Sequence, residues 1–127
     1  MPLLTINELE SMSPVFRGKT GNSFAGFLMH VLSLDKVNDL YDRNICHAGP
    51  AFARAVLKDL GVSYEIENPE ILDMLPEGPF ITISNHPYGS IDGVMLVDIF
   101  GHLRKDYKVM VNRFLGRIEP LQGNFIC

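Results

Sequence analysis

Residues 84–93 read Ser-Asn-His-Pro-Tyr-Gly-Ser-Ile-Asp-Gly, and the interpretation of the whole chain depends on this stretch. It follows the apolar run 79–83, Pro-Phe-Ile-Thr-Ile, which is typical of a buried strand. It precedes residues 94–100, which predict a buried helix. His86 and Asp92 therefore belong to a strand-to-helix turn, a common place for functional side chains. An imidazole held by a carboxylate can accept a proton from a hydroxyl or an amine near neutral pH.

The spacing of His86 and Asp92 requires a bend in the chain. In a straight strand or helix this spacing would not bring the two side chains together, but Gly89 accepts dihedral angles closed to other residues and Pro87 fixes its own φ. Each residue alone also has a structural interpretation. Asp92 would stabilise the start of a helix capped by Ser90, and His86 would be a hydrogen-bonded loop residue. Their combination in one turn favours a catalytic dyad.

The rest of the chain predicts an α/β fold, with N-terminal helices followed by a parallel or mixed sheet with helical crossovers. Residues 1–21 are expected to form an N-terminal arm, and residues 22–127 part of a single α/β domain. Helices are expected at 22–42, 51–60 and 90–103, a helical turn at 69–75, and strands at 62–67, 79–84 and 107–111. The strand–helix–strand order implies a right-handed crossover. Because a parallel sheet is normally covered on both faces, three strands suggest an incomplete domain, either truncated or borrowing surface from a partner.

The charge of the chain excludes one class of partner. The net charge of −4 makes the 127-residue chain a poor electrostatic match for nucleic acid. Residues 101–127 are nevertheless basic, with five cationic and two acidic side chains. We interpret this segment either as ordinary solvated surface or as a patch for the phosphate of a ligand or a membrane. The cations are Arg104, Lys105, Lys108, Arg113 and Arg117.

The cysteines and the apolar runs predict an intracellular protein. Cys46 and Cys127 cannot build a disulfide framework, and their surroundings lack zinc-ligand spacing, so neither a metal nor a bound cofactor is expected. The N-terminus lacks the basic start and apolar core of a signal peptide. The longest apolar stretch, 24–34, is too short to span a bilayer. We expect a cytoplasmic protein, either soluble or peripheral to the inner face of the cell membrane.

The motif also carries a family resemblance. Asn-His followed by Asp at this distance resembles the first signature block of the glycerolipid (lysophospholipid) acyltransferases, although five residues rather than the usual four separate His86 from Asp92. The longer form, Asn-His-Pro-x-Gly-x-Ile-Asp-Gly, is similar to the hemolysin-like branch of that superfamily, which is associated with acylating lyso-ornithine and related amino-acid lipids. The resemblance covers about residues 22–127, with 108–112 matching the strand after the block.

The resemblance implies roles in phospholipid and amino-acid lipid biosynthesis. His86 would deprotonate the acceptor hydroxyl, which attacks the thioester of acyl-CoA or acyl carrier protein, while Asp92 orients the histidine. Because the later blocks of the family are not matched, the chain is expected to be an N-terminal part that is inactive alone. The candidates for substrate binding are Asn85, Gly89 and Ser90 within the block and the downstream Arg113 and Arg117.

Two other functions remain open at this point. The chain could be a non-catalytic module that binds lipid or a protein partner and retains a vestigial dyad. It could also be a hydrolase with His86 as the base for water, although no serine or cysteine lies in a recognisable nucleophile elbow. Binding without turnover would indicate the first, and hydrolysis without an acceptor would indicate the second. The oligomeric state is not predicted.

Overall fold

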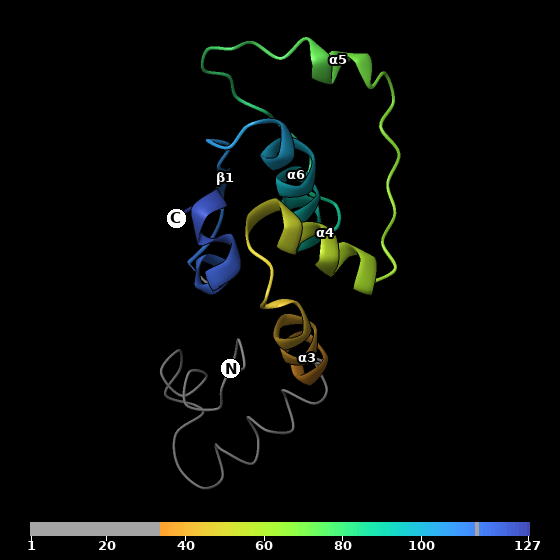
Figure 1. The fold of residues 1–127 in the computed structure, drawn as a ribbon, viewed down its shortest axis with the longest axis vertical. Coiled ribbons are helices and arrows are strands. Elements are labelled where there is room, and N and C mark those ends of the chain that lie inside the picture. Colours follow the sequence, from red (N-terminus) through yellow and green to blue (C-terminus); the bar gives the residue numbers. More distant parts are fainter. Residues whose placement is uncertain (1–33, 114) are drawn as a thin grey trace, which may run out of the picture.

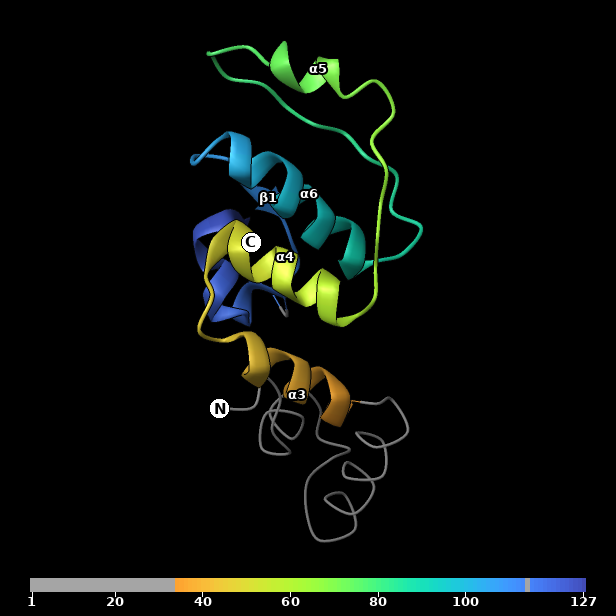
Figure 2. The same ribbon diagram turned by 45° about the vertical axis from the view of Figure 1, so that its right-hand side comes forward.

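Two long helices and the C-terminal segment form the centre of the molecule. The structure is a computed structural model that describes residues 34–113 and 115–127. Helices α4 and α6 lie side by side, and the C-terminal segment packs against them (Figure 2). The elements are α3 (Leu34–Asn44), α4 (Gly49–Asp59), α5 (Glu70–Asp73), α6 (Ser90–Leu103), β1 (Val109–Met110), the 3₁₀ helices η2 (Leu115–Arg117) and η3 (Glu119–Asn124), and β2 (Phe125–Ile126).

Helix α4 follows the sequence signals at both of its ends. Pro50 occupies its first turn, where the missing N–H costs nothing. Gly61 adopts a φ of +67° just beyond the end, and the N–H groups of Gly61 and Val62 donate to the carbonyls of Lys58 and Leu57. This is the double hydrogen bond of a Schellman motif, so the predicted helix and its glycine stop are confirmed.

The N-terminal predictions are tested only in part. Helix α3 extends to Asn44, two residues beyond the predicted end at 42. The predicted arm, 1–21, and the predicted helical residues 22–33 lie outside the described residues. Within the described part of the chain, no helix is long and apolar enough to cross a membrane.

The core lies where α3, α4, α6 and η3 meet. Val97 and Leu121 are fully buried at its centre. Gly101 allows the close approach of the two long helices, because a Cβ there would lie 2.6 Å from Cγ of Pro50. The other buried members of the cluster are Tyr41, Phe52, Ala53 and Val56.

The sheet is parallel, as predicted, but it contains two paired strands. Val109 of β1 aligns with Phe125 of β2, and Met110 with Ile126. Strand β1 lies within the predicted 107–111. Strand β2 and the two 3₁₀ helices occupy the tail 112–127, for which the sequence predicted no element.

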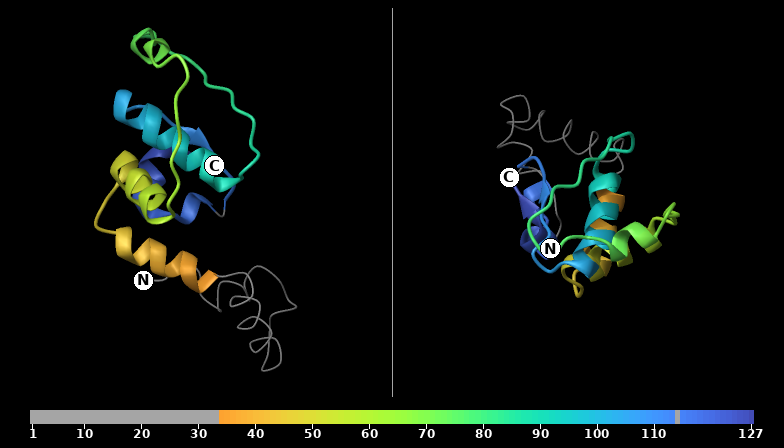
Figure 3. Two further views of the ribbon diagram at one scale, coloured as in Figure 1. Left: turned by 90° about the vertical axis from the view of Figure 1, so that its right-hand side faces the viewer. Right: turned by 90° about the horizontal axis from the view of Figure 1, so that it is seen from above.

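Residues 62–83 form an extended strap rather than two strands. The strap leaves the end of α4, carries α5 at its far point, and returns toward the start of α6 (Figures 1 and 3). The predicted strands 62–67 and 79–84 are therefore wrong, because neither has a ladder of backbone hydrogen bonds to a neighbour. The predicted burial of 79–83 is also wrong, since Ile81 and Ile83 are 89% and 94% exposed.

Side-chain contacts hold the returning part of the strap. The ring of Phe80 stacks on that of Tyr107 with centroids 6.4 Å apart, and the hydroxyls of Thr82 and Tyr107 share a 2.7 Å hydrogen bond. These contacts alternate with the outward-facing Ile81 and Ile83, so the period of two typical of an extended chain is kept. The apolar run predicted an extended chain here, but it indicated neither the outward-facing isoleucines nor the missing backbone partner.

Candidate active site

A sharp turn brings the predicted dyad together. Gly89 adopts φ +66° and ψ −126°, a conformation closed to most side chains, and it directly precedes helix α6. Ser90 is the first residue of α6, so Gly89 rather than Ser90 occupies the N-cap position, which corrects the predicted serine cap. The turn, residues 84–89, therefore ends where the helix that carries Asp92 begins.

His86 and Asp92 form a hydrogen-bonded pair. Nδ1 of His86 lies 3.2 Å from Oδ2 of Asp92. Because a carboxylate only accepts hydrogen bonds, Nδ1 carries the proton, and Nε2 of the neutral ring has a free lone pair. The Asp92 side chain is 8% exposed, whereas that of His86 is 64% exposed. The pair thus combines a buried carboxylate with an imidazole that a substrate can reach.

Asp92 also stabilises the turn itself. Its Oδ2 accepts a 2.9 Å hydrogen bond from the backbone N–H of Tyr88. The carboxylate lies in the first turn of α6, where the helix dipole favours negative charge. The structural and the functional interpretations of Asp92 are therefore compatible, because one carboxylate both closes the turn and holds the imidazole.

The predicted substrate-binding residues of the motif lie on different sides of α6. Asn85 and Ser84 border an open groove along the outer face of the helix, together with Asp92. Ser90 borders an apolar cavity of about 350 Å³ on the core side, which also contacts Val94 and Leu121. Gly89 contributes its backbone conformation. Asn85 thus lies on the groove side of α6, and Ser90 lies on its core side.

Two cations of the basic C-terminal segment form hydrogen bonds with other parts of the chain. Arg104 forms a two-pronged ion pair with Asp106, with hydrogen bonds of 2.9 and 2.8 Å, and lowers the pKa of that carboxyl. The same guanidinium donates to the carbonyls of Pro76 and Gly78 in the strap. Nζ of Lys108 donates to the carbonyl of Gly123. Arg104 is therefore neutralised by Asp106, whereas Lys108 is bound by a neutral carbonyl and keeps its charge.

Arg113 and Arg117 lie beyond the end of β1. Val111 directly follows β1 and borders the same core-side cavity as Ser90. The end of this strand therefore lies near the start of α6. Arg113 follows two residues later and is exposed, and Arg117 is the exposed last residue of η2. The hydrogen bonds of the dyad join Nδ1 of His86 and the backbone N–H of Tyr88 to the Asp92 carboxylate.

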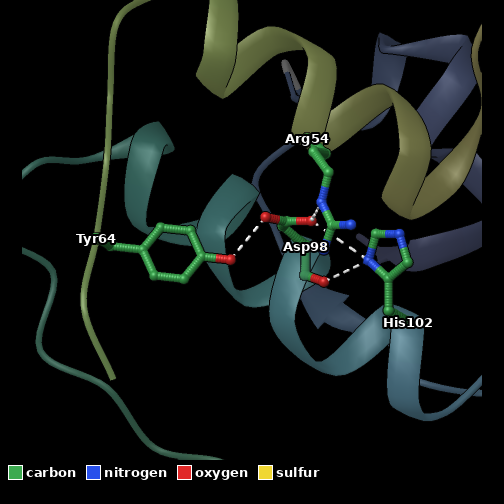
Figure 4. A network of polar contacts seen from close by, with 4 residues as sticks. All are labelled: Arg54, Tyr64, Asp98 and His102. Carbon is green, nitrogen blue, oxygen red and sulfur yellow. Dashed lines mark hydrogen bonds and ion pairs between the residues drawn. The ribbon is translucent and has the colours of Figure 1, made fainter. Parts of the chain in front are cut away.

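A second polar cluster was not foreseen from the sequence. Asp98 in α6 is buried, and its carboxylate accepts hydrogen bonds from Nε of Arg54 at 3.0 Å and from the hydroxyl of Tyr64 at 2.6 Å. Nδ1 of His102 donates to the backbone carbonyl of Asp98 at 2.6 Å and lies 3.3 Å from its Oδ1. Figure 4 shows α4, the strap and α6 meeting at this carboxylate.

One signal in the sequence could have revealed this cluster. Asp98 interrupts the apolar run of α6, and a carboxylate in such a run must find donors when it is buried. Burial and the hydrogen bond to Asp98 raise the pKa of Tyr64 to about 12. The partners could not be identified in advance because they are 44 and 34 residues away in the chain.

Within residues 34–113 and 115–127, no group of three or more His, Cys, Asp or Glu side chains is placed to hold an ion. The His86–Asp92 pair provides one base and one carboxylate, an arrangement that suits proton transfer from an incoming hydroxyl.

Comparison with known proteins identified a sequence family and a curated protein that are similar to this chain. Residues 20–127 match the sequence family described as Acyltransferase. Over 97 residues, 75% of this chain, the sequence is 32% identical to a lyso-glycine lipid O-acyltransferase of Phocaeicola vulgatus. The match spans 34% of that relative, about a third of its length. No solved structure matches the chain.

Proposed function

Because the chain belongs to the Acyltransferase family, we propose that its dyad transfers a fatty acyl group from a thioester donor to the hydroxyl of a lyso-lipid. The observation that carries the proposal is the His86–Asp92 pair, with the carboxylate buried and the imidazole open to solvent. The donor is acyl-CoA or acyl carrier protein. No bound cofactor takes part in the reaction as proposed.

The proposed reaction includes two proton transfers, one to His86 and one from it. Nε2 of His86 accepts the proton of the acceptor hydroxyl while the hydroxyl oxygen attacks the thioester carbonyl. Collapse of the tetrahedral intermediate breaks the carbon–sulfur bond. The imidazolium then returns the proton to the departing thiolate, leaving a lipid ester and a free thiol. Asp92 holds the ring in the required tautomer and stabilises its positive charge.

We propose that the acceptor belongs to the lyso forms of amino-acid lipids, with lysophospholipids as the broader alternative. Support comes from the lyso-glycine lipid O-acyltransferase, which is 32% identical over the aligned part of this chain. Arg113 and Arg117 are proposed to bind anionic groups of the substrates, and Asn85, Gly89 and Ser90 to shape the binding site around the base.

The test of this function uses the full-length product of the gene. The purified protein is incubated with lyso-glycine lipid and either palmitoyl-CoA or palmitoylated acyl carrier protein, and the acylated lipid and released thiol are both measured. We expect His86→Ala to lower the rate by about 10²–10⁴-fold, the contribution typical of a general base. The matched control is His47→Ala, which removes another exposed histidine.

The possible results separate the three functions considered. An unchanged rate in His86→Ala would contradict the proposal. Binding of the lyso-lipid without release of thiol would favour a non-catalytic binding module. Release of thiol without acylated lipid would favour a hydrolase. Equal loss of rate in the His47 control would indicate damage to the fold instead of loss of the base.

We further propose that the protein meets its lipid acceptor at the inner face of the cell membrane. Ile81, Ile83 and Met110 are 89%, 94% and 85% exposed, which suits contact with an apolar phase. Sedimentation with phospholipid vesicles tests this, and the double variant Ile81→Ser, Ile83→Ser is expected to bind less. Equal binding of the variant and the wild type would contradict a role for these side chains.

A further inference from the structure

The turn that carries His86 lies between two anchored segments. His86 is four residues after Thr82 and four residues before Ser90, the first residue of α6. The downstream anchor is α6, because Asp92 in its first turn accepts hydrogen bonds from His86 and from the backbone N–H of Tyr88. The direction in which the imidazole points therefore depends also on what fixes the chain upstream, at Thr82.

Upstream of the turn, side chains hold the strap in place. Within the described part of the chain, no backbone hydrogen bond joins residues 79–85 to another segment. The hydroxyl of Thr82 shares a 2.7 Å hydrogen bond with that of Tyr107, and the ring of Phe80 stacks on the same tyrosine. Phe80 and Thr82 are half-buried. The bond between Thr82 and Tyr107 is thus the last hydrogen bond from the strap to another described segment before the turn.

Tyr107 has a fixed position because other residues hold its backbone and its ring. Its carbonyl accepts a 3.1 Å hydrogen bond from Nδ2 of the buried Asn124, and its N–H donates to the carbonyl of Arg104. Its ring stacks on that of Phe100 in α6, with centroids 5.1 Å apart. The hydroxyl at the end of this ring therefore sets the position of Thr82 relative to α6 and the core.

A general base acts well only when it is placed closely. A displacement of about 1 Å can lower a rate by about 100-fold. The side chain of His86 is 64% exposed, so packing around the ring contributes little to its position. On the basis of the function proposed above, we propose that Tyr107 is a positioning residue, which acts through Thr82 to keep the His86 imidazole paired with Asp92. Its role is to hold the strap, and it is not proposed to contact the substrate.

Loss of the Tyr107 hydroxyl should loosen the turn without releasing the strap. Arg104 donates hydrogen bonds to the carbonyls of Pro76 and Gly78. Its guanidinium also lies over the ring of Phe80, 5.3 Å from the centroid. These contacts do not involve the hydroxyl, and a phenylalanine at position 107 keeps a ring for stacking. We therefore expect Tyr107→Phe to leave the strap attached and to make the position of His86 less precise.

The first experiment measures the state of the imidazole without turnover. Pairing with Asp92 keeps the neutral ring of His86 in its Nδ1–H tautomer, whereas an unpaired ring populates both tautomers. The full-length protein is labelled with ¹⁵N-histidine, and the ring nitrogen NMR signals of His86 are assigned with His86→Gln. We expect Tyr107→Phe to raise the Nε2–H fraction of His86 several-fold in alkaline buffer, where the ring is neutral.

Two controls show whether this change is specific. Tyr64→Phe removes a comparable hydroxyl at the other end of the strap, where it donates to Asp98 at 2.6 Å, and should leave the His86 tautomer unchanged. His102 is an internal reference, because its Nδ1 donates to the Asp98 carbonyl within the same helix. An unchanged His86 tautomer in a Tyr107→Phe protein that is folded by circular dichroism would overturn the proposal. An equal change in Tyr64→Phe would also overturn it.

The second experiment tests whether Tyr107 acts through Thr82. Thr82→Val removes the partner hydroxyl with little change of shape, and Thr82→Ser keeps it. We expect Tyr107→Phe and Thr82→Val each to lower the kcat of acyl transfer by about tenfold with KM within about twofold, and Thr82→Ser to retain most of the rate. The double variant should lose no more than either single variant, because both remove the same hydrogen bond. Additive losses would overturn the proposal.

The two experiments separate failure of the positioning role from failure of the proposed function. A changed His86 tautomer in Tyr107→Phe, in a protein that transfers no acyl group, would support the positioning role and contradict the acyltransferase activity. An unchanged tautomer in an active protein would overturn the positioning role and leave the proposed function standing.

Discussion

Helix α6 carries two buried aspartates that differ in the residues to which they are hydrogen-bonded. Asp92 and Asp98 are 7% and 4% exposed. Asp92 holds His86, whose other nitrogen remains open to solvent. Asp98 is enclosed by Arg54, Tyr64 and His102, each of which belongs to the framework of the molecule. The two carboxylates thus differ in their partners: Asp92 holds the histidine of an exposed turn, whereas Asp98 joins α4 and the strap to α6.

The sharpest test of this comparison exchanges each carboxylate for an amide. We expect Asp92→Asn to lower the acyl-transfer rate by about 100-fold, because the amide no longer stabilises the imidazolium or selects its tautomer. Asp98→Asn should change that rate by only a few-fold. Initial rates at saturating donor measure both effects. Equal losses in the two variants would remove the distinction between the aspartates.

Stability should show the opposite order. We expect Asp98→Asn to lower the free energy of unfolding by about 1–3 kcal/mol, because its new amide N–H groups face the donors of Arg54 and Tyr64. Asp92→Asn should cost less, since its remaining carbonyl oxygen can still accept from the N–H of Tyr88. Urea unfolding followed by circular dichroism gives both values. A larger loss for Asp92→Asn would reverse the assignment.

The Tyr64 hydroxyl should contribute a smaller, pH-dependent part of the stability. Tyr64→Phe should cost about 0.5–1.5 kcal/mol near pH 7, the value of one hydrogen bond. The folded state raises the pKa of this phenol from 10.0 to about 12. Its contribution is therefore complete below pH 10 and lost as the pH rises toward 12. Unfolding experiments across this range should show a steeper decline for the wild type than for Tyr64→Phe, and parallel curves would contradict the assignment.

The smallest effect is expected at the exposed end of β1. Arg113→Ala should change the free energy of unfolding by less than about 0.5 kcal/mol, because the side chain is exposed. If this arginine binds an anionic substrate group, the KM should rise by no more than about fivefold, as for a solvent-exposed charge pair. Steady-state kinetics at low and high salt measure this change. An effect on kcat instead of KM would place Arg113 nearer to the reaction.

The turn that joins His86 to Asp92 was predictable because its determinants are local. His86 and Asp92 are six residues apart, and Gly89 and the first turn of α6 supply the bend that joins them. The same is true of the end of α4, where the N–H groups of Gly61 and Val62 donate to carbonyls three and five residues earlier in the chain, respectively. In both cases the chain itself brings the groups together, so the residue types and their spacing carry the information.

The strap was predicted incorrectly because its environment is set by distant residues. The apolar run 79–83 indicates an extended chain, but burial and strand pairing require a neighbour to supply contacts and hydrogen bonds. In the structure, Tyr107 contacts the strap through side chains, and Ile81 and Ile83 remain exposed. An apolar run favours burial without indicating which segment covers it.

The sequence by itself determined the turn that joins His86 to Asp92 and the glycine stop of α4, since each follows from the conformational limits of neighbouring residues. Only the tertiary structure decided that Asp98 would join Arg54 to Tyr64 and that the strap would form one wall of a groove beside the dyad. These contacts join segments far apart in the chain. Their geometry depends on how α4, α6 and the strap pack together, which residue spacing alone does not specify.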